Sequence, residues 1–169
     1  MSKKRITDDK AMQWLSNAKT SGVRLIHILN MLLDLSRIDS NQMSLNKQAE
    51  DLGALIEKNI QSIRALNDKK NISISFNDQF KQPVFLDSAL TSQLLTKLLD
   101  NAIKYSPADS KIEILLRQDE LGDAEIVITD EGLGFPADEI DKAYERFHQT
   151  SRTDDGSGGC GLGLSIAKE

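Results

Sequence analysis

A chain of 169 residues can bury one substantial core and carry an extension, but it is too short for two ordinary domains. Its hydrophobic content of 39% and its charged content of 28% are ordinary globular values, which exclude a wholly disordered or fibrous protein. A net charge of -5, with no basic run beyond Lys3, Lys4 and Arg5, argues against nucleic acid as a partner. Apolar stretches are too short to cross a bilayer, and the single cysteine, Cys160, fits a reducing compartment. We therefore expect a cytoplasmic piece, whose parent protein can still be membrane-anchored.

Residues 9–40 form one long helical pattern with two adjacent apolar stripes. The stripes consist of Leu25, Ile28, Leu32 and Leu35, and of Ile26, Leu29 and Leu33. An isolated helix cannot bury a surface this wide, so we expect it to pack in a bundle with helices of another chain. An intramolecular core helix is the alternative, although little further helix follows it in the sequence.

The chain beyond residue 50 alternates between helical and strand patterns, which predicts an α+β fold. The predicted ranges are a helix at 52–68, strands at 72–76 and 83–86, a helix at 88–105, strands at 111–117 and 124–129, and a helix starting at 164. Asp51 is the expected cap of the first of these helices, and Asp87 or Ser88 that of the second. The second helix must stop at Ser106 because Pro107 follows.

The helix at 88–105 carries Lys97, Asn101, Lys104 and Tyr105 on one face, at spacings of three and four residues. An amide oxygen, as on Asn101, is an uncharged hard ligand that suits Mg²⁺ already neutralised by nucleotide phosphates. Lys104 can meet a phosphate as a point charge. For this helix alone, a surface helix whose Asn only hydrogen-bonds a loop explains the pattern equally well.

Two glycine-containing segments add to this candidate nucleotide site. Asp130 ends an apolar strand, where a ligand crevice commonly opens, and its carboxylate can hold an adenine amine. Gly132 and Gly134 permit the turn that follows, although most turns of this type bind nothing. The glycines between 156 and 163 precede an apolar helix start, which places free N–H groups and a positive helix end together, as phosphate binding requires.

In this order, the segments resemble the ATP-binding catalytic part of a two-component sensor histidine kinase, preceded by the second helix of its dimerisation hairpin. The matching segments are 32–38 (hairpin end), 94–107 (N box), 130–134 (G1 box), 144–147 (F box) and 158–164 (G2 box). The resemblance implies a Bergerat-type two-layer α/β sandwich, with a mixed sheet and helices on one face. It divides the chain into a partial dimerisation hairpin at 1–42 and an ATP-binding catalytic domain at 43–169 that is shortened at its C-terminus.

The resemblance also implies roles for individual residues. Asn101 would bind Mg²⁺, and Asp130 would bond the adenine amine within a turn that Gly132 and Gly134 complete. Lys104 and Tyr105 would contact phosphate and the base or sugar end of ATP, and Arg146 would lie near the terminal phosphate. The phosphate side would be lined by Gly159, Cys160, Gly161, Leu162 and Gly163.

The implied activity is that of a protein-histidine kinase, which transfers the γ-phosphoryl group of ATP to a histidine for relay to a response-regulator aspartate. The implied partners are ATP, a receiver domain and a histidine-bearing hairpin, with a homodimer in the parent protein. A non-catalytic nucleotide-sensing or dimerisation module is the alternative. A serine kinase of the anti-sigma type is disfavoured, because it would have no use for the long helix.

The chain departs from the family pattern in four places. It lacks a histidine in the acceptor context, and we expect His27 and His148 to be structural or incidental, so the chain alone should not phosphorylate itself. Lys97 stands where this family usually has a second Asn, and where related ATPases have a Glu as general base, which argues against a hydrolase. Cys160 fills a position often held by Thr or Ser. The family continues with further strands after Glu169, so we expect an uncovered sheet edge.

Overall fold

The computed structural model describes residues 8–40, 44–66, 70–146, 148 and 163–168, and it separates the chain into two compact units, Met1–Met43 and Ser44–Glu169. The first unit is the helix α1 (Asp8–Asp39), as the sequence predicts. Its large exposed apolar side chains are Met12, Trp14, Leu15, Val23, Leu25, Ile26, Leu29, Leu32 and Leu33. Among the described helices, none combines the length and the apolarity that a bilayer crossing needs.

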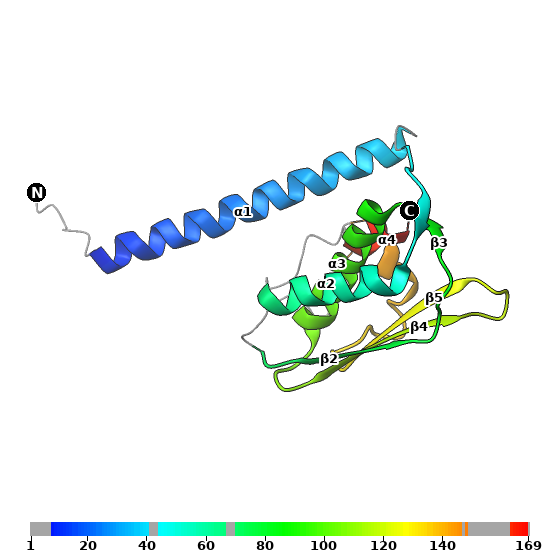
Figure 1. The fold of residues 1–169 in the computed structure, drawn as a ribbon. Helices are drawn as coiled ribbons and strands as arrows, with labels where there is room; N and C mark the ends of the chain where they lie inside the picture. Colours follow the sequence, from blue (N-terminus) through cyan, green and yellow to red (C-terminus); the bar gives the residue numbers. More distant parts are fainter. Residues whose placement is uncertain (1–7, 41–43, 67–69, 147, 149–162, 169) are drawn as a thin grey trace, which may run out of the picture. The chain divides into compact units, whose positions relative to one another are not determined.

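The second unit is a two-layer α+β arrangement (Figure 1). Its elements are β1 (Gln48–Glu50), α2 (Leu52–Leu66), β2 (Ser73–Asp78), β3 (Val84–Leu86), α3 (Ser88–Tyr105), β4 (Lys111–Gln118), β5 (Ala124–Asp130), the 3-10 helix η1 (Asp141–Tyr144) and α4 (Gly163–Lys168). In the main sheet β2 is parallel to β4, and β4 is antiparallel to β5. The helices α2 and α3 cover one face of this sheet, so the predicted mixed sheet with helices on one face is confirmed.

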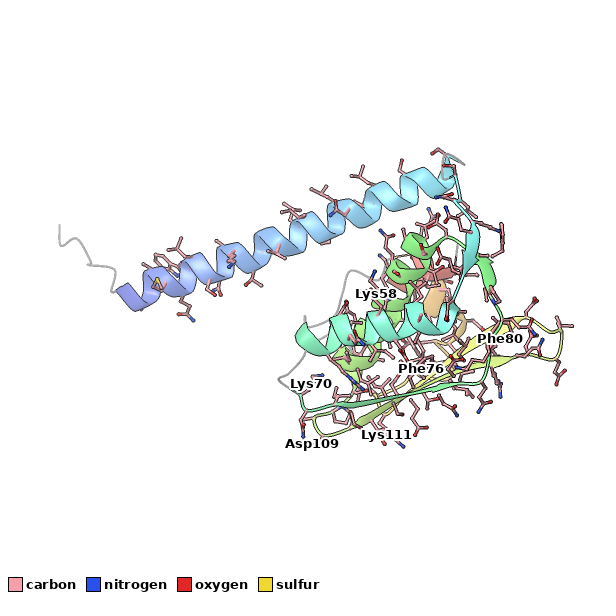
Figure 2. All side chains as sticks on the ribbon, viewed as in Figure 1. Lys58, Lys70, Phe76, Phe80, Asp109 and Lys111 are labelled. Carbon is pink, nitrogen blue, oxygen red and sulfur yellow. The ribbon has the colours of Figure 1, made fainter. Side chains whose placement is uncertain are left out.

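The core lies between the helices and the sheet, because each element buries only one side. Along β4 the side chains of Ile112, Ile114 and Leu116 are buried, whereas Lys111 and Glu113 are exposed. The helices contribute Leu52, Ile56, Ile60 and Ile63 from α2, and Leu95, Leu99, Ala102 and Ile103 from α3. Two aromatic side chains labelled in Figure 2, Phe76 and Phe80, are half-buried and pack against this core.

The sequence misjudged three details of this unit. The spacing of apolar residues predicts that Leu94, Leu95, Leu98, Leu99 and Ala102 form the buried side of α3, but Leu94 and Leu98 are only half-buried and Ile103 is buried as well. The strand β1 was not expected, since three polar or small residues carry no strand pattern. It exists because β3 offers it an antiparallel partner, which pairs Ala49 with Phe85. The 3-10 helix η1 was also not predicted.

Aspartates cap both long helices of the second unit, as predicted. Asp51 Oδ1 accepts a hydrogen bond from the backbone N–H of Ala54 at 3.0 Å. Asp87 Oδ1 accepts from the N–H groups of Ala89 and Leu90, both at 3.1 Å, and its Oδ2 accepts from Asn46 at 2.9 Å. The N–H groups of Leu90, Asn46 and Ala89 hold the pKa of Asp87 below its ordinary value of 3.8, against a smaller opposing effect of burial.

The Asp87 cap predicts a specific dependence of stability on pH. Because its folded pKa is lowered, the ionised carboxylate contributes fully above its unfolded pKa, and the contribution is lost as pH falls through the folded pKa. The variant Asp87→Asn keeps an acceptor but no charge. We expect the wild type to be the more stable protein at neutral pH, with a difference that shrinks below about pH 4. Urea unfolding across acidic and neutral pH measures this difference, and one that stayed constant into strong acid would contradict the prediction.

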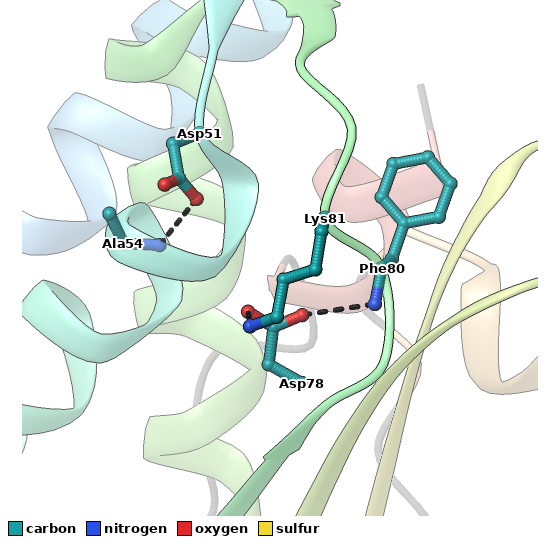
Figure 3. A network of polar contacts seen from close by, with 5 residues as sticks. All are labelled: Asp51, Ala54, Asp78, Phe80 and Lys81. Carbon is teal, nitrogen blue, oxygen red and sulfur yellow. Dashed lines mark hydrogen bonds and ion pairs between the residues drawn. The ribbon is translucent and has the colours of Figure 1, made fainter.

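A second set of polar contacts lies where the end of β2 approaches the start of α2 (Figure 3). Asp78 Oδ1 accepts from the backbone N–H of Phe80 at 3.1 Å, and Oδ2 accepts from Lys81 Nζ at 2.6 Å. The Lys81 hydrogen bond is the main cause of a lowered pKa at Asp78, with the Phe80 N–H adding to it. A Cβ at Gly53 would collide with Asp78 Oδ2 and lie 3.1 Å from its Cγ. Glycine is therefore the residue that lets this carboxylate lie against α2.

We expect Gly53→Ala to destabilise the second unit by about 1–3 kcal/mol, because the added methyl group displaces a carboxylate that is already hydrogen-bonded. Gly22→Ala is a matched control, since Gly22 has no atom within 4 Å of its would-be Cβ and lies within a helix. Alanine is favoured over glycine there. Denaturant unfolding of the full chain measures both variants, and equal stability of the Gly53→Ala variant and the wild type would refute the steric argument.

Candidate functional site

The candidate site begins with the last turns of α3, which carry three of the residues that the sequence singled out. Asn101 is half-buried, and its side-chain amide makes no hydrogen bond with another described residue. The alternative of an Asn that bonds a loop therefore finds no partner within the described part of the chain. Lys104 is exposed, and its Nζ lies 4.9 Å from the centroid of the Tyr105 ring. A half-buried lysine, Lys97, lies one turn before Asn101.

The turn after β5 packs directly against the end of α3. Asp130 Oδ1 accepts a hydrogen bond from the N–H of Gly132 at 2.8 Å, which fixes one oxygen of the carboxylate. An ideal Cβ at Gly132 would lie 2.6 Å from that oxygen and 3.2 Å from the carbonyl oxygen of Tyr105. Gly132 is therefore required for close approach, whereas Gly134 has a φ of 61° and open space around it. These contacts bring the predicted N-box and G1-box residues together.

The strand register determines which face of the sheet Asp130 occupies. Asp130 pairs with Ile112 in the antiparallel ladder between β4 and β5. Side chains of directly opposite residues lie on the same face, and Ile112 is buried beneath the helices. Asp130 therefore belongs to the helix-covered face, at the exposed end of its strand. Its Oδ2 makes no hydrogen bond with another described residue, so this oxygen is available to a ligand.

A small surface hollow beside Asp130 is a poorer candidate for an anionic ligand. Its lining residues are Lys111, Glu113, Thr129, Asp130 and Glu131. Three of these are carboxylates, and the single lysine is already ion-paired with Glu113. Lys111 and Glu113 also lie on the open face of the sheet, away from the helices. We therefore locate the candidate site on the opposite, helix-covered side of Asp130.

The second part of the candidate site surrounds α4. This helix contacts both α3 and η1. Lys168 Nζ lies 5.7 Å from the centroid of the Tyr144 ring, which joins α4 to η1. The exposed Arg146 lies two residues after the end of η1, and Gly163 is the first residue of α4. The other predicted phosphate-side residues, Gly159, Cys160, Gly161 and Leu162, lie outside the described residues.

Neither histidine joins this site among the described contacts. His148 Nε2 lies 3.7 Å from Glu139 Oε2, and both side chains are mostly buried. His27 lies on α1, but its side chain is outside the described part of the chain.

The described residues fit a cation that brings most of its own ligands. No group of three or more His, Cys, Asp or Glu side chains gathers within the described ranges to form a protein cage. An uncharged amide such as Asn101 can add one oxygen to a Mg²⁺ ion whose other ligands are phosphate oxygens and waters. The donor set therefore suits a metal–nucleotide complex better than a free metal ion.

Two contacts that hold the site were missed by the sequence interpretation. Glu131 Oε2 accepts from the backbone N–H of Lys111 at 3.0 Å and ties the G1-box turn to the start of β4. Lys70 donates to carbonyl groups at the end of α3. Neither contact has a local signal, because each joins residues that are at least 20 positions apart in the chain.

Comparisons with known proteins agree with this arrangement. The family model described as "Histidine kinase-, DNA gyrase B-, and HSP90-like ATPase" matches residues 86–169. The chain is 31% identical over 166 residues to a protein named sensor protein kinase WalK from Staphylococcus aureus, a match that covers 96% of the chain and 27% of that relative. A second WalK sequence from this species is covered to 39%. The chain thus spans well under half of the length of the curated relatives it matches.

Solved structures give the same family and fold. The mycobacterial sensor histidine kinase MprB is 30% identical, with a TM-score of 0.62 over 72% of this chain and 76% of that one. Full-length ShkA in complex with AMPPNP has a TM-score of 0.79 at 20% identity, over 98% of this chain and 34% of that one. The latter, at this identity, supports the fold alone.

The contact between Gly132 and Tyr105 can be tested without any ligand. We expect Gly132→Ala to push the turn away from α3, because its Cβ would meet a backbone carbonyl that cannot rotate aside. The backbone amide resonances of Tyr105 and Ser106 should therefore shift in an NMR spectrum of the folded chain. Gly122→Ala is the control, since its φ of 92° makes alanine unfavourable there, as the close contacts do at Gly132, but it lies in the distant β4–β5 hairpin. Shifts confined to the mutated turn in both variants would show that the two segments are not in contact.

Proposed function

The chain belongs to the sensor histidine kinases, and we propose that it acts as the ATP-binding catalytic core that supplies the γ-phosphoryl group for a histidine acceptor. The observation that carries this proposal is the packing of Gly132 against the Tyr105 carbonyl. Through that contact, the end of α3, which carries the candidate metal ligand Asn101, packs against the turn that follows the candidate base-binding residue Asp130.

Asp130 would recognise the adenine base. One carboxylate oxygen is held by the Gly132 N–H, which fixes the orientation of the group. The other oxygen makes no hydrogen bond with another described residue and can accept one from the exocyclic amine. Tyr105, half-buried beside this turn, would contact the base or sugar end.

Asn101 and Lys104 would act at the phosphate end. Bound Mg²⁺ would supply charge neutralisation across the phosphates, and Asn101 would hold it through its side-chain oxygen. The exposed ammonium of Lys104, which can leave its position over the Tyr105 ring, would meet a phosphate oxygen. Arg146 and the segment from Gly159 to Gly163, with Cys160 in it, would complete the phosphate side. Such a site works by positioning and charge neutralisation, since phosphoryl transfer asks little covalent chemistry of a protein.

The partners follow from the two units. The exposed apolar side chains of α1 suit a helical bundle with a histidine-bearing hairpin, within a homodimer of the parent protein. The phosphohistidine would then pass its phosphoryl group to an aspartate of a response-regulator receiver domain. All of these steps would take place in the cytoplasm, where ATP is available.

We expect Asn101→Ala to remove the Mg²⁺-dependent part of nucleotide binding and to abolish transfer. The measurement is calorimetric titration with a non-hydrolysable ATP analogue, with and without Mg²⁺, together with transfer of label from ATP to a separately supplied phospho-accepting hairpin. A loss of at least about 10–100-fold in affinity is expected, because changing even the residues that support a metal ligand costs that much. Asn77→Ala is the matched control, because Asn77 is an exposed amide on β2 outside the site.

The outcomes separate the candidate functions. Binding and transfer that both depend on Asn101 but not on Asn77 would support the kinase core. Tight binding without transfer to any supplied hairpin would favour a non-catalytic nucleotide-sensing module. Undiminished transfer by the Asn101→Ala variant would refute the assignment of the metal site.

A further inference from the structure

A single ammonium group closes the C-terminal end of α3. Lys70 Nζ donates to the carbonyl oxygens of Ile103 at 2.9 Å, Lys104 at 2.7 Å and Ser106 at 2.9 Å. An ammonium has three protons, so these contacts can use its full donor capacity. Lys70 lies just before β2, between 33 and 36 residues away from its acceptors. It therefore joins two segments that are distant in the sequence.

The sequence of α3 explains why such a donor is needed. In a regular helix the carbonyl of Ile103 would accept from the N–H of residue 107, but Pro107 has no N–H. The Ser106 N–H still bonds the Ala102 carbonyl at 3.1 Å, and the chain then becomes extended at a Ser106 ψ of 145°. The following carbonyl groups are left without helical donors. Lys70 fills this place with a charged donor at the negative end of the helix dipole.

Lys70 is itself held in place by the chain around it. The Lys70 carbonyl accepts from the N–H of Asp109 at 2.9 Å, and Asn71 Nδ2 donates to Asp109 Oδ1 at 2.7 Å. Both Asn71 and Asp109 have positive φ angles, 52° and 60°, so each segment turns sharply toward the other. Figure 2 labels Lys70 and Asp109 at the end of the sheet where β2 begins. These contacts hold in place the backbone that carries the Lys70 side chain.

We propose that Lys70 is a positioning residue for nucleotide binding, which fixes the last turn of α3 so that Asn101, Lys104 and Tyr105 keep their places in the site. This inference rests on the proposed function. Lys70 bonds the carbonyl group of Lys104, a residue that would meet ATP, and that of its neighbour Ile103. The next carbonyl group in the chain, that of Tyr105, faces the Gly132 turn. Release of this end would loosen both the metal-binding and the base-binding sides of the site together.

The test compares Lys70→Met, which removes all donors, with Lys70→Arg, which keeps charge and donors, in the full chain. Lys81→Met is the control, since Lys81 is an exposed lysine whose ion pair with Asp78 lies at the other end of β2. Each protein is titrated with the Mg²⁺ complex of a non-hydrolysable ATP analogue, at a temperature where circular dichroism shows it to be folded. We expect about tenfold weaker binding for Lys70→Met, near-complete rescue by Lys70→Arg, and no change for Lys81→Met.

A second readout makes no use of nucleotide. Hydrogen exchange at the Ser106 amide, which closes the last helical bond of α3, should be faster in Lys70→Met than in the wild type. If Lys70→Met does not fold, Lys70→Gln, which retains two donors, takes its place in both measurements.

The outcomes are distinct. Folded Lys70→Met with wild-type affinity would overturn the inference, because a merely structural cap would lower stability and leave binding unchanged. Wild-type protein that binds no nucleotide would overturn the proposed function. In that case hydrogen exchange alone decides whether Lys70 holds the last turn of α3. Unchanged exchange at the Ser106 amide in Lys70→Met would then show that it does not, and would overturn the inference.

Discussion

The position of Pro107 constrains the rest of the candidate site. Because proline cannot continue the helix, α3 has to end at Tyr105, and its last carbonyl groups must find donors elsewhere. Lys70, which lies 33 residues before Ile103 in the sequence, supplies donors to these carbonyl groups, and the Tyr105 carbonyl faces Gly132. The two ends of α3 are thereby both fixed by charged groups, since Asp87 caps the opposite end. A helix held at both ends and buried along one side offers its remaining face as a rigid platform.

The register between β4 and β5 has an equally direct effect on the site. Side chains alternate between the two faces of a sheet, so a shift of one residue would move Asp130 from the helix-covered face to the open one. The carboxylate would then lie opposite Lys111 or Glu113, on the open face and away from α3. The apolar side chains of β5, Ala124, Ile126 and Ile128, pack against the core, and the shift is unfavourable because it would expose them. Packing of the core therefore also specifies the position of a polar residue at the sheet's edge.

Local signals in the sequence predicted a large part of this structure. The caps at Asp51 and Asp87, the end of α3 and the alternation along β4 all depend on interactions within a few residues, which a sequence displays directly. The strand β1 could not be predicted, because its three residues depend on a partner that lies 36 residues away, as in the pairing of Ala49 with Phe85. Lys70 was missed for the same reason. Its sequence context is that of an ordinary turn lysine, and only the fold reveals that it faces the end of α3.

The charges around α3 also bear on which reaction the site can support. A water molecule becomes a nucleophile only if a neighbouring group accepts its proton, and a carboxylate on α3 could do so. The half-buried residue one turn before Asn101 is Lys97, and an ammonium has no lone pair to accept a proton. Under the proposed function, the face of this helix that meets the phosphates would offer Asn101 as an uncharged metal ligand and Lys97 and Lys104 as cations, none of which serves as a base for water. If the proposed function holds, such a set would keep ATP intact until an external nucleophile arrives, as transfer to a histidine on a separate hairpin would require.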